Sequence, residues 1–244
     1  MKLTVIGFWG GFPAKNEATS GYLLETEGFS LLIDCGSGVL SKLQNYKKLE
    51  DLDAVWLSHY HHDHVADIGP LYFARLVKGQ LGQVTQVMPI YGHTLDKVAF
   101  DELTNQNVTK GIAYQEDTPL QIGPFQMTFL RTHHSVPCFA TRLNFKGKTL
   151  VYTADTSLFP ELIAFSKNAD LLIAECSLYD AQDGRAYGHL TSKDVADLAK
   201  AANAKRVLLT HLPHYGNHGD LIKRVQHDFN EKVQLAKTGW TWEV

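Results

Sequence analysis

Short apolar runs, separated by polar or glycine-containing segments, predict a series of buried strands. Each run is rich in leucine, valine and isoleucine, as in strands that are covered on both faces. The runs read LTVIGF, SLLID, AVWLS, MTFLR, TLVYT, DLLIA and RVLLT. The predicted strands therefore cover residues 3–8, 30–34, 54–58, 127–131, 149–153, 170–174 and 206–210.

Helical spacing is clearest after Thr191, which can form a capping box with Asp194 and is followed by apolar residues at 195, 198, 199 and 202. Pro160 suits the first turn of another helix, and the segment DLIKRVQHDFNE at 220–231 predicts a last one. No low-complexity linker divides the chain. Strands alternating with helices predict one α/β domain over residues 1–244.

Several predicted strands run directly into an ionisable residue. Rigid strand ends are good supports for a site that must hold its geometry. Exposed loops also often begin with polar residues, but the repetition of His, Asp and Glu at these ends favours a shared functional site. The residues are Asp34, His59, Asp155, Glu175 and His211.

Composition narrows the class of protein. The chain has 44% hydrophobic and 20% charged residues, as soluble globular proteins do. Its formal charge of -3 argues against a duplex-binding protein, while RNA contact through a local basic patch is left open. No apolar run is long enough to span a membrane, and the start MKLTVIGFWGGF reads as a strand rather than a signal peptide. Cys35, Cys138 and Cys176 form no CxxC motif, so we expect reduced thiols and a cytoplasmic protein.

The segment SHYHHDH at 58–64 concentrates four histidines and one aspartate after a predicted strand. His59 and His61 alternate, so their side chains can point the same way, and a helix beginning here would turn Asp63 and His64 toward a nearby point. Imidazole and carboxylate together suit zinc, and also manganese or iron. A surface histidine tract is the alternative, but a tract would not follow a buried strand.

This H-x-H-x-D-H motif resembles the metallo-β-lactamase superfamily, and the later motifs resemble its RNase Z-like branch. The resemblance covers nearly the whole chain, from LLIDCGSG through HSVPCFATR and VYTADT to LLTHLPHYG. It implies a four-layer αββα sandwich with the metal site at one edge of the two sheets, where Asp34 would support the ligands.

The resemblance also implies two metal ions, most simply zinc. His59, His61 and His134 would hold one, and Asp63, His64 and His211 would hold the other, with Asp155 bridging the pair. A metal-bridging hydroxide, which Asp63 helps to orient, would then attack an anionic substrate.

Two further matches favour phosphoryl over acyl chemistry. The branch has a glutamate at a strand end and a histidine before a small-residue–Thr pair, matched by Glu175 in AECS and His189 in GHLTS. A glutamate that orients a histidine and stabilises its protonated form produces a proton donor for a leaving alkoxide. The alternative is that Glu175 only ends a strand and His189 only precedes a helix.

The chain departs from the tRNA-maturing members of the branch. Only LNFKGKTLV separates Arg142 from Tyr152, which leaves a hairpin where those members carry a long tRNA-gripping arm. The branch also has an arginine where His214 stands, and a histidine where Ala174 stands. These departures argue against efficient tRNA 3′-processing and leave the metal ligands unaffected.

The sequence therefore predicts a dinuclear metal-dependent hydrolase, a phosphodiesterase for a small or flexible phosphodiester such as a nucleotide or RNA end. A thioester or lactone hydrolase is the first alternative, and a tRNA 3′-end endoribonuclease the second. A non-catalytic scaffold would not need a complete ligand set. We expect a small anionic substrate and no membrane partner; a homodimer is left open.

Overall fold

All seven predicted strands are strands in the computed structural model, which describes residues 1–116 and 118–244. Their ends differ from the predicted ones by at most two residues, and β12 (Arg206–Thr210) matches at both ends. The structure contains further strands that the apolar runs did not predict, among them β2 (Gly21–Thr26), β5 (Met88–His93) and β9 (Phe139–Phe145). The predicted α/β class is therefore correct at the level of elements.

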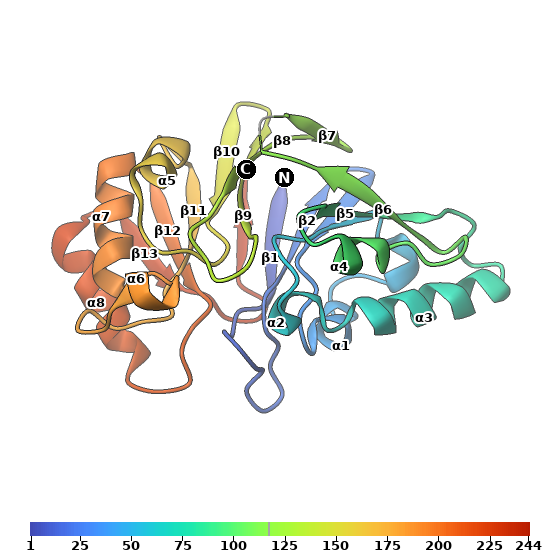
Figure 1. The fold of residues 1–244 in the computed structure, drawn as a ribbon, viewed down its shortest axis with the longest axis horizontal. Helices are drawn as coiled ribbons and strands as arrows, with labels where there is room; N and C mark the ends of the chain where they lie inside the picture. The colour runs from blue at the N-terminus through green and yellow to red at the C-terminus, as the bar shows by residue number, and fades with distance from the viewer. Residues whose placement is uncertain (117) are drawn as a thin grey trace. The chain divides into compact units, whose positions relative to one another are not determined.

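Residues 1–115 and 237–244 form one unit, which we call unit 1 (blue to green, with the chain end, in Figure 1). It is built on a seven-stranded sheet with the order β14-β1-β2-β3-β4-β5-β6. The remaining strands are β1 (Lys2–Gly7), β3 (Phe29–Ile33), β4 (Ala54–Trp56), β6 (Thr109–Tyr114) and β14 (Thr241–Glu243). The helices are α1 (Val39–Leu43), η1 (Leu49–Asp51), α2 (His62–Val65), α3 (Ile68–Gln80) and α4 (Lys97–Asp101).

Residues 116–236 form the other unit, unit 2 (green to red in Figure 1). Its seven-stranded sheet has the order β13-β12-β11-β10-β9-β8-β7. The remaining strands are β7 (Leu120–Ile122), β8 (Phe125–Arg131), β10 (Lys148–Tyr152), β11 (Leu171–Glu175), β12 (Arg206–Thr210) and β13 (Lys232–Leu235). The helices are α5 (Pro160–Phe165), α6 (Gly184–Tyr187), α7 (Ser192–Ala202) and α8 (His218–Asp228). The single domain expected over residues 1–244 stays a prediction.

Both sheets follow the same plan, with antiparallel strands in one half and parallel strands in the other. In unit 1 the pairs from β3 to β6 are parallel, and in unit 2 the pairs from β10 to β13 are parallel. Neighbouring parallel strands end on the same edge of a sheet, so the residues that follow them are brought together. This arrangement positions the candidate site residues within each unit.

The predicted helices are present in unit 2. Thr191 and Asp194 form both hydrogen bonds of the capping box at the start of α7, whose apolar side is buried. Pro160 lies in the first turn of α5, as predicted. Helix α8 begins two residues before the predicted start, because the Asn217 side chain accepts a hydrogen bond from Gly219 N. It ends at Asp228, where the predicted helix continued to 231.

The hairpin expected after Arg142 is present. Strands β9 and β10 pair antiparallel and are joined by Lys146 and Gly147, both with positive φ (47° and 76°), as in a tight two-residue turn. The guanidinium Nη1 of Arg142 donates to the carbonyl oxygens of Phe165 and Lys167, each at 2.9 Å, which fastens the end of α5 to the sheet. A two-residue turn leaves no arm at this position.

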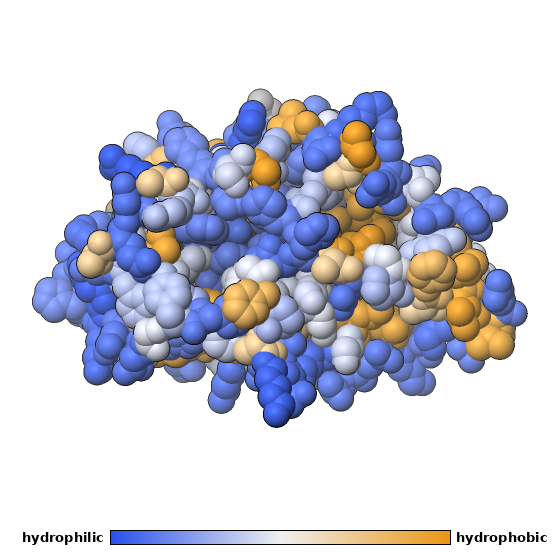
Figure 2. All heavy atoms as spheres, turned by 60° about the horizontal axis from the view of Figure 1, so that its bottom comes forward, coloured by the Kyte–Doolittle hydropathy of each residue, from blue (hydrophilic) through white to orange (hydrophobic). Residues whose placement is uncertain are grey.

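Helix α3 of unit 1 carries an exposed apolar stripe. Phe73, Val77 and Leu81 are spaced four residues apart and are 62%, 52% and 67% exposed. Figure 2 shows orange surface on the right-hand side of this face, the side on which Figure 1 draws α3. Exposed apolar patches often bind partners, and the homodimer left open by the sequence stays a prediction. Within the described residues, no helix combines the length and apolarity that a membrane crossing requires.

Candidate metal centre

The first group of candidate residues lies at the ends of β3 and β4 in unit 1. Asp34 follows β3 and takes up a positive φ of 56°, a conformation that is uncommon for residues other than glycine. This turn lets its carboxylate accept hydrogen bonds from the backbone N–H of Ser58 (2.8 Å) and from the Ser58 hydroxyl (2.9 Å). The two parallel strand ends are thereby joined directly beneath the histidine motif.

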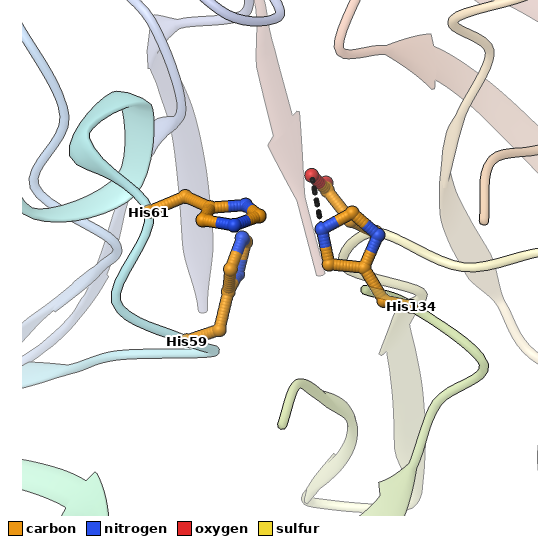
Figure 3. A group of neighbouring side chains, drawn as sticks. His59, His61 and His134 are labelled. Atoms are coloured by element: carbon orange, nitrogen blue, oxygen red, sulfur yellow. Dashed lines mark ion pairs between the residues drawn. The ribbon is translucent and has the colours of Figure 1, made fainter. Parts of the chain in front are cut away.

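The motif itself wraps around one point. His61 precedes the first turn of α2, and Asp63 and His64 lie within that turn. The ring centroid of His59 lies 4.8 Å from that of His61 and 4.1 Å from that of His64, and Figure 3 shows the first two rings side by side. His59 and His64 are fully buried and Asp63 is nearly so, whereas His62 is exposed.

Hydrogen bonds determine which ring nitrogens of unit 1 are available to a metal. The Nδ1 of His64 lies 2.8 Å from Asp34 Oδ2, and a carboxylate can only accept, so this nitrogen carries a proton. Because the Ser58 hydroxyl donates to Asp34, its oxygen accepts from Nδ1 of His59 at 3.0 Å. In both rings Nε2 is then the atom with the lone pair, the usual pattern for metal-binding histidine.

Asp63 is held by the glycine-rich first turn. Its Oδ2 accepts from the backbone N–H of Gly11 at 2.8 Å and lies 3.6 Å from Nε2 of His64. The backbone of Asp63 packs on Gly36, where an added Cβ would lie only 1.9 Å from the Asp63 carbonyl oxygen. Gly36 of LLIDCGSG is therefore needed for close packing against Asp63.

The second group lies at the ends of β10, β11 and β12 in unit 2. These strands are parallel neighbours, so Asp155, Glu175 and His211 come to one edge of the sheet. Positive φ values at Ala154 (49°) and His211 (51°) turn the chain sharply just past the strands. Asp34 of unit 1 has the same left-handed conformation, which is uncommon for residues other than glycine.

His134 joins this group from the loop between β8 and β9. Its Nδ1 lies 3.0 Å from the carbonyl oxygen of Gly188, which can only accept, so Nε2 again carries the lone pair. Nε2 of His134 and Nε2 of His211 lie 3.8 and 3.3 Å from the same oxygen, Oδ2 of Asp155. The dashed line in Figure 3 marks the first of these ion pairs. One carboxylate thus approaches two imidazoles, as a bridging ligand does.

Glu175 is the centre of a hydrogen-bond network in unit 2. Its Oε1 accepts from the backbone N–H of Thr156 at 2.8 Å and lies 2.9 Å from Nδ1 of His189. Its Oε2 accepts from the hydroxyl of Ser177 at 2.6 Å, and that hydroxyl oxygen in turn lies 2.7 Å from Nδ1 of His211. One buried carboxylate therefore orients two histidines, one directly and one through a serine.

The sequence motifs did not predict a role for Ser58 or Ser177. Asp34–Ser58–His59 in unit 1 and Glu175–Ser177–His211 in unit 2 have the same carboxylate–hydroxyl–imidazole order. The only signal in the sequence is that Ser58 directly precedes His59 and that Ser177 lies two residues after Glu175. Serine is too common beside polar residues for this spacing to identify it.

The other histidines have different surroundings. His133 stacks on Phe159, with ring centroids 4.1 Å apart and planes inclined by 15°, while the adjacent His134 faces Asp155. His93 is buried against the Tyr60 ring, and the ring of His227 is 79% exposed. His214 is exposed. The two adjacent histidines of HHSVP therefore lie in different environments.

The donors in both units fit a divalent metal. Each unit presents imidazole Nε2 atoms and an aspartate, and the opposite edge of four of the rings is held by a carboxylate, a carbonyl or a hydroxyl. Such support fixes the ring and raises its basicity, as expected for ligands of zinc and similar ions.

The three cysteines are free, as predicted, and all of them are buried. Burial raises the pKa of the Cys35 and Cys176 thiols, and the negative charges of Asp67 and Glu175 raise it further.

We expect an aromatic disulfide reagent at pH 8 to label the native protein at least about 100-fold more slowly than the denatured protein, because both access and thiolate formation are suppressed. Rapid labelling of Cys176 in the folded protein, located by peptide mapping, would contradict this.

Comparison with known proteins identifies the family. A family model described as "Beta-lactamase superfamily domain" matches residues 30–212. The chain is 56% identical over 243 residues to the Bacillus subtilis (strain 168) protein named "Probable metallo-hydrolase YhfI", with all of both chains covered. The crystal structure of YhfI, described as a metallo-beta-lactamase fold protein, has a TM-score of 0.98 at 54% identity, over 99% of this chain and 98% of that one.

More distant structures share the fold. The short form of human tRNase Z (ELAC1) has a TM-score of 0.77 at 23% identity, and the match covers 100% of this chain and 99% of the tRNase Z chain. A diphosphatase from the PhnP family has a TM-score of 0.76 at 17% identity, over 100% and 97%. The chain belongs to the beta-lactamase superfamily, has the predicted metallo-β-lactamase fold and is a metallo-hydrolase of that fold.

Proposed function

We propose that the chain is a dinuclear metal-dependent phosphodiesterase that hydrolyses a small or flexible phosphodiester, such as a nucleotide or an RNA end. The proposed cofactor is two zinc ions per chain, with manganese or iron as the alternatives. The proposed ligands are His59, His61, Asp63 and His64 of unit 1 and His134, Asp155 and His211 of unit 2.

Two bound divalent ions lower the pKa of water and withdraw negative charge from phosphoryl oxygens. The two aspartates among the ligands would cancel two of the four positive charges of the ions, so the site with both ions bound would keep a net positive charge that attracts an anionic substrate. Asp63 would also orient the attacking water, because Gly11 holds one of its oxygens in place.

The Glu175–His189 pair is the observation that carries the proposal. The Glu175 side chain is 1% exposed and receives the backbone N–H of Thr156, so it is fixed in place. The His189 side chain is 21% exposed, and its Nδ1 faces Glu175 at 2.9 Å, which directs Nε2 away from the carboxylate. A buried carboxylate stabilises the imidazolium, and His189 can then protonate an alkoxide leaving group.

Proton donation of this kind favours phosphodiester hydrolysis over thioester hydrolysis. Thioester hydrolysis releases a weakly basic thiolate, which has little need of a proton donor. A lactone releases an alkoxide as a phosphodiester does, so the assays rather than this pair distinguish those two substrates. The tRNase and the diphosphatase that share the fold give further support. The two-residue turn between β9 and β10 argues against a role in tRNA 3′-processing, because no arm is available there to hold a tRNA.

Parallel assays test the proposal. We expect the purified holoenzyme to hydrolyse bis(4-nitrophenyl) phosphate, to lose this activity with a chelator and to regain it with zinc or manganese, because the ions supply the nucleophile and the charge. Precursor tRNA should be cleaved more slowly than the small diester. Rapid hydrolysis of an acyl thioester without diesterase activity would transfer the assignment to the thioester or lactone class, and full activity after chelation would exclude the metal centre.

A further inference from the structure

Unit 2 contains a cavity of about 600 Å³ beside the candidate site. Three segments line it: residues 133–135 after β8, residues 157–160 at the start of α5, and residues 185–188 at the end of α6. Pockets for small organic ligands have volumes of roughly 300–1,000 Å³. The cavity is therefore large enough for one nucleoside unit.

Two aromatic side chains give this cavity flat surfaces. The His133 ring lies parallel to Phe159, which is 7% exposed, so Phe159 packs on one face of the imidazole, while His133 itself is exposed. Tyr187 at the end of α6 is 65% exposed. Covering an exposed tyrosine ring is favourable because apolar surface is removed from water. A flat group between His133 and Tyr187 would cover both rings.

The cavity wall is tied to the candidate catalytic residues through Gly188. This residue has a φ of 67°, accepts a hydrogen bond from Nδ1 of His134, and precedes His189 directly. An added Cβ at Gly188 would lie 3.1 Å from the Cα of His134. A ligand bound in the cavity therefore lies close enough for its own phosphate group to reach His134 and His189.

Polar side chains also line the cavity and supply hydrogen-bonding groups and a positive charge. Arg185 lines the cavity and is exposed, and across residues 1–116 and 118–244 no ion pair involves its guanidinium. Ser135 and Ser157 add hydroxyl groups. A planar ring with hydrogen-bonding edges, carried on an anionic phosphate, matches this combination of flat apolar faces, hydroxyls and one positive charge.

We infer that this cavity binds the nucleobase of a nucleoside phosphodiester, stacked between His133 and Tyr187, while its phosphate lies at the candidate metal centre. The inference rests on the proposed function, whose substrate class it specifies. Base–aromatic stacking lowers dissociation constants by roughly fivefold to 100-fold per base.

Binding of two probes to the holoenzyme tests the subsite without requiring turnover. Adenosine 5′-monophosphate and ribose 5-phosphate share the sugar phosphate and differ in the base. We expect calorimetry to give a dissociation constant about tenfold or more lower for the nucleotide. Tyr187→Ala should remove most of this difference, Tyr187→Phe should keep it, and His133→Ala should reduce it. Phe73→Ala, which removes an equally exposed ring from unit 1, should not change it.

Equal binding of the two probes would overturn the subsite, and so would a tenfold difference that persists in both Tyr187→Ala and His133→Ala. The diesterase assay separates this failure from that of the proposed function. Equal binding together with diester hydrolysis removes only the subsite, whereas binding of neither probe together with no diester hydrolysis removes both. Because Tyr187 is largely exposed, its replacement leaves the core intact.

Discussion

Replacing His61, His134 or His211 by alanine is expected to strip metal from the protein and to abolish hydrolysis. Loss of a residue that only supports a metal-binding histidine typically costs 10–100-fold in metal affinity, so loss of the ligand itself should cost more than about 100-fold. Elemental analysis of gently purified protein should find about two metal ions per wild-type chain, and each variant should show a clear deficit together with lost diesterase activity.

Histidines next to the ligands serve as matched controls. His62→Ala and His133→Ala should retain the metal, because His62 is exposed on α2 and His133 stacks on Phe159. His214→Ala should also retain it. The assignment around the β8–β9 loop would be wrong if His133→Ala lost the metal and His134→Ala kept it. A well-folded, fully active protein without any transition metal would refute the ligand set as a whole.

The second large effect concerns His189. Its replacement by alanine should lower kcat by about 10²–10⁴-fold on a diester with an alkoxide leaving group, because the proton that this oxygen needs is no longer delivered. The loss should be much smaller for 4-nitrophenolate, which leaves without protonation. Steady-state kinetics on two diesters that differ only in the leaving group would measure the contrast.

Metal content distinguishes this role from a ligand role. His189→Ala should keep its metal, and His227→Ala, which removes an exposed ring from α8, should change neither substrate's kcat. Equal losses on both leaving groups would exclude His189 as the proton donor. A loss of metal in His189→Ala would instead make it a ligand, with Glu175 as its support.

The pattern of apolar residues was sufficient to predict the strands whose residues are apolar on both faces. Strand β10 reads KTLVY and β12 reads RVLLT, and nearly all of their side chains are buried. Strand β9, which reads FATRLNF, has mixed burial, and β5 contains a proline and a glycine. Such strands are stabilised by pairing with neighbours that are distant in sequence, so their composition alone does not predict them.

Local competition also limited the prediction of helix ends. The sequence predicts a helix from Asp220, but Asn217 caps α8 earlier. At the other end Phe229 adopts an extended conformation (φ -130°) and is buried, which ends the helix before 231. The burial of one aromatic side chain outweighs the helical tendency of the residues around it, and burial is a tertiary property.

The metallo-β-lactamase fold and the set of candidate ligands could be predicted from the sequence through its resemblance to the superfamily. SHYHHDH and the ionisable residues that follow apolar strands indicated a metal site, and the later motifs that carry the resemblance completed the ligand set, because all of these signals are local along the chain.

Only the tertiary structure decided how those ligands are supported and what lies beside them. The hydrogen bond from His134 to Gly188 joins residues 54 positions apart, and that from His211 to Ser177 joins residues 34 positions apart. Such contacts depend on the order and register of the strands in the sheet, to which no short stretch of sequence corresponds. For the same reason the cavity between His133 and Tyr187 was found only in the folded chain.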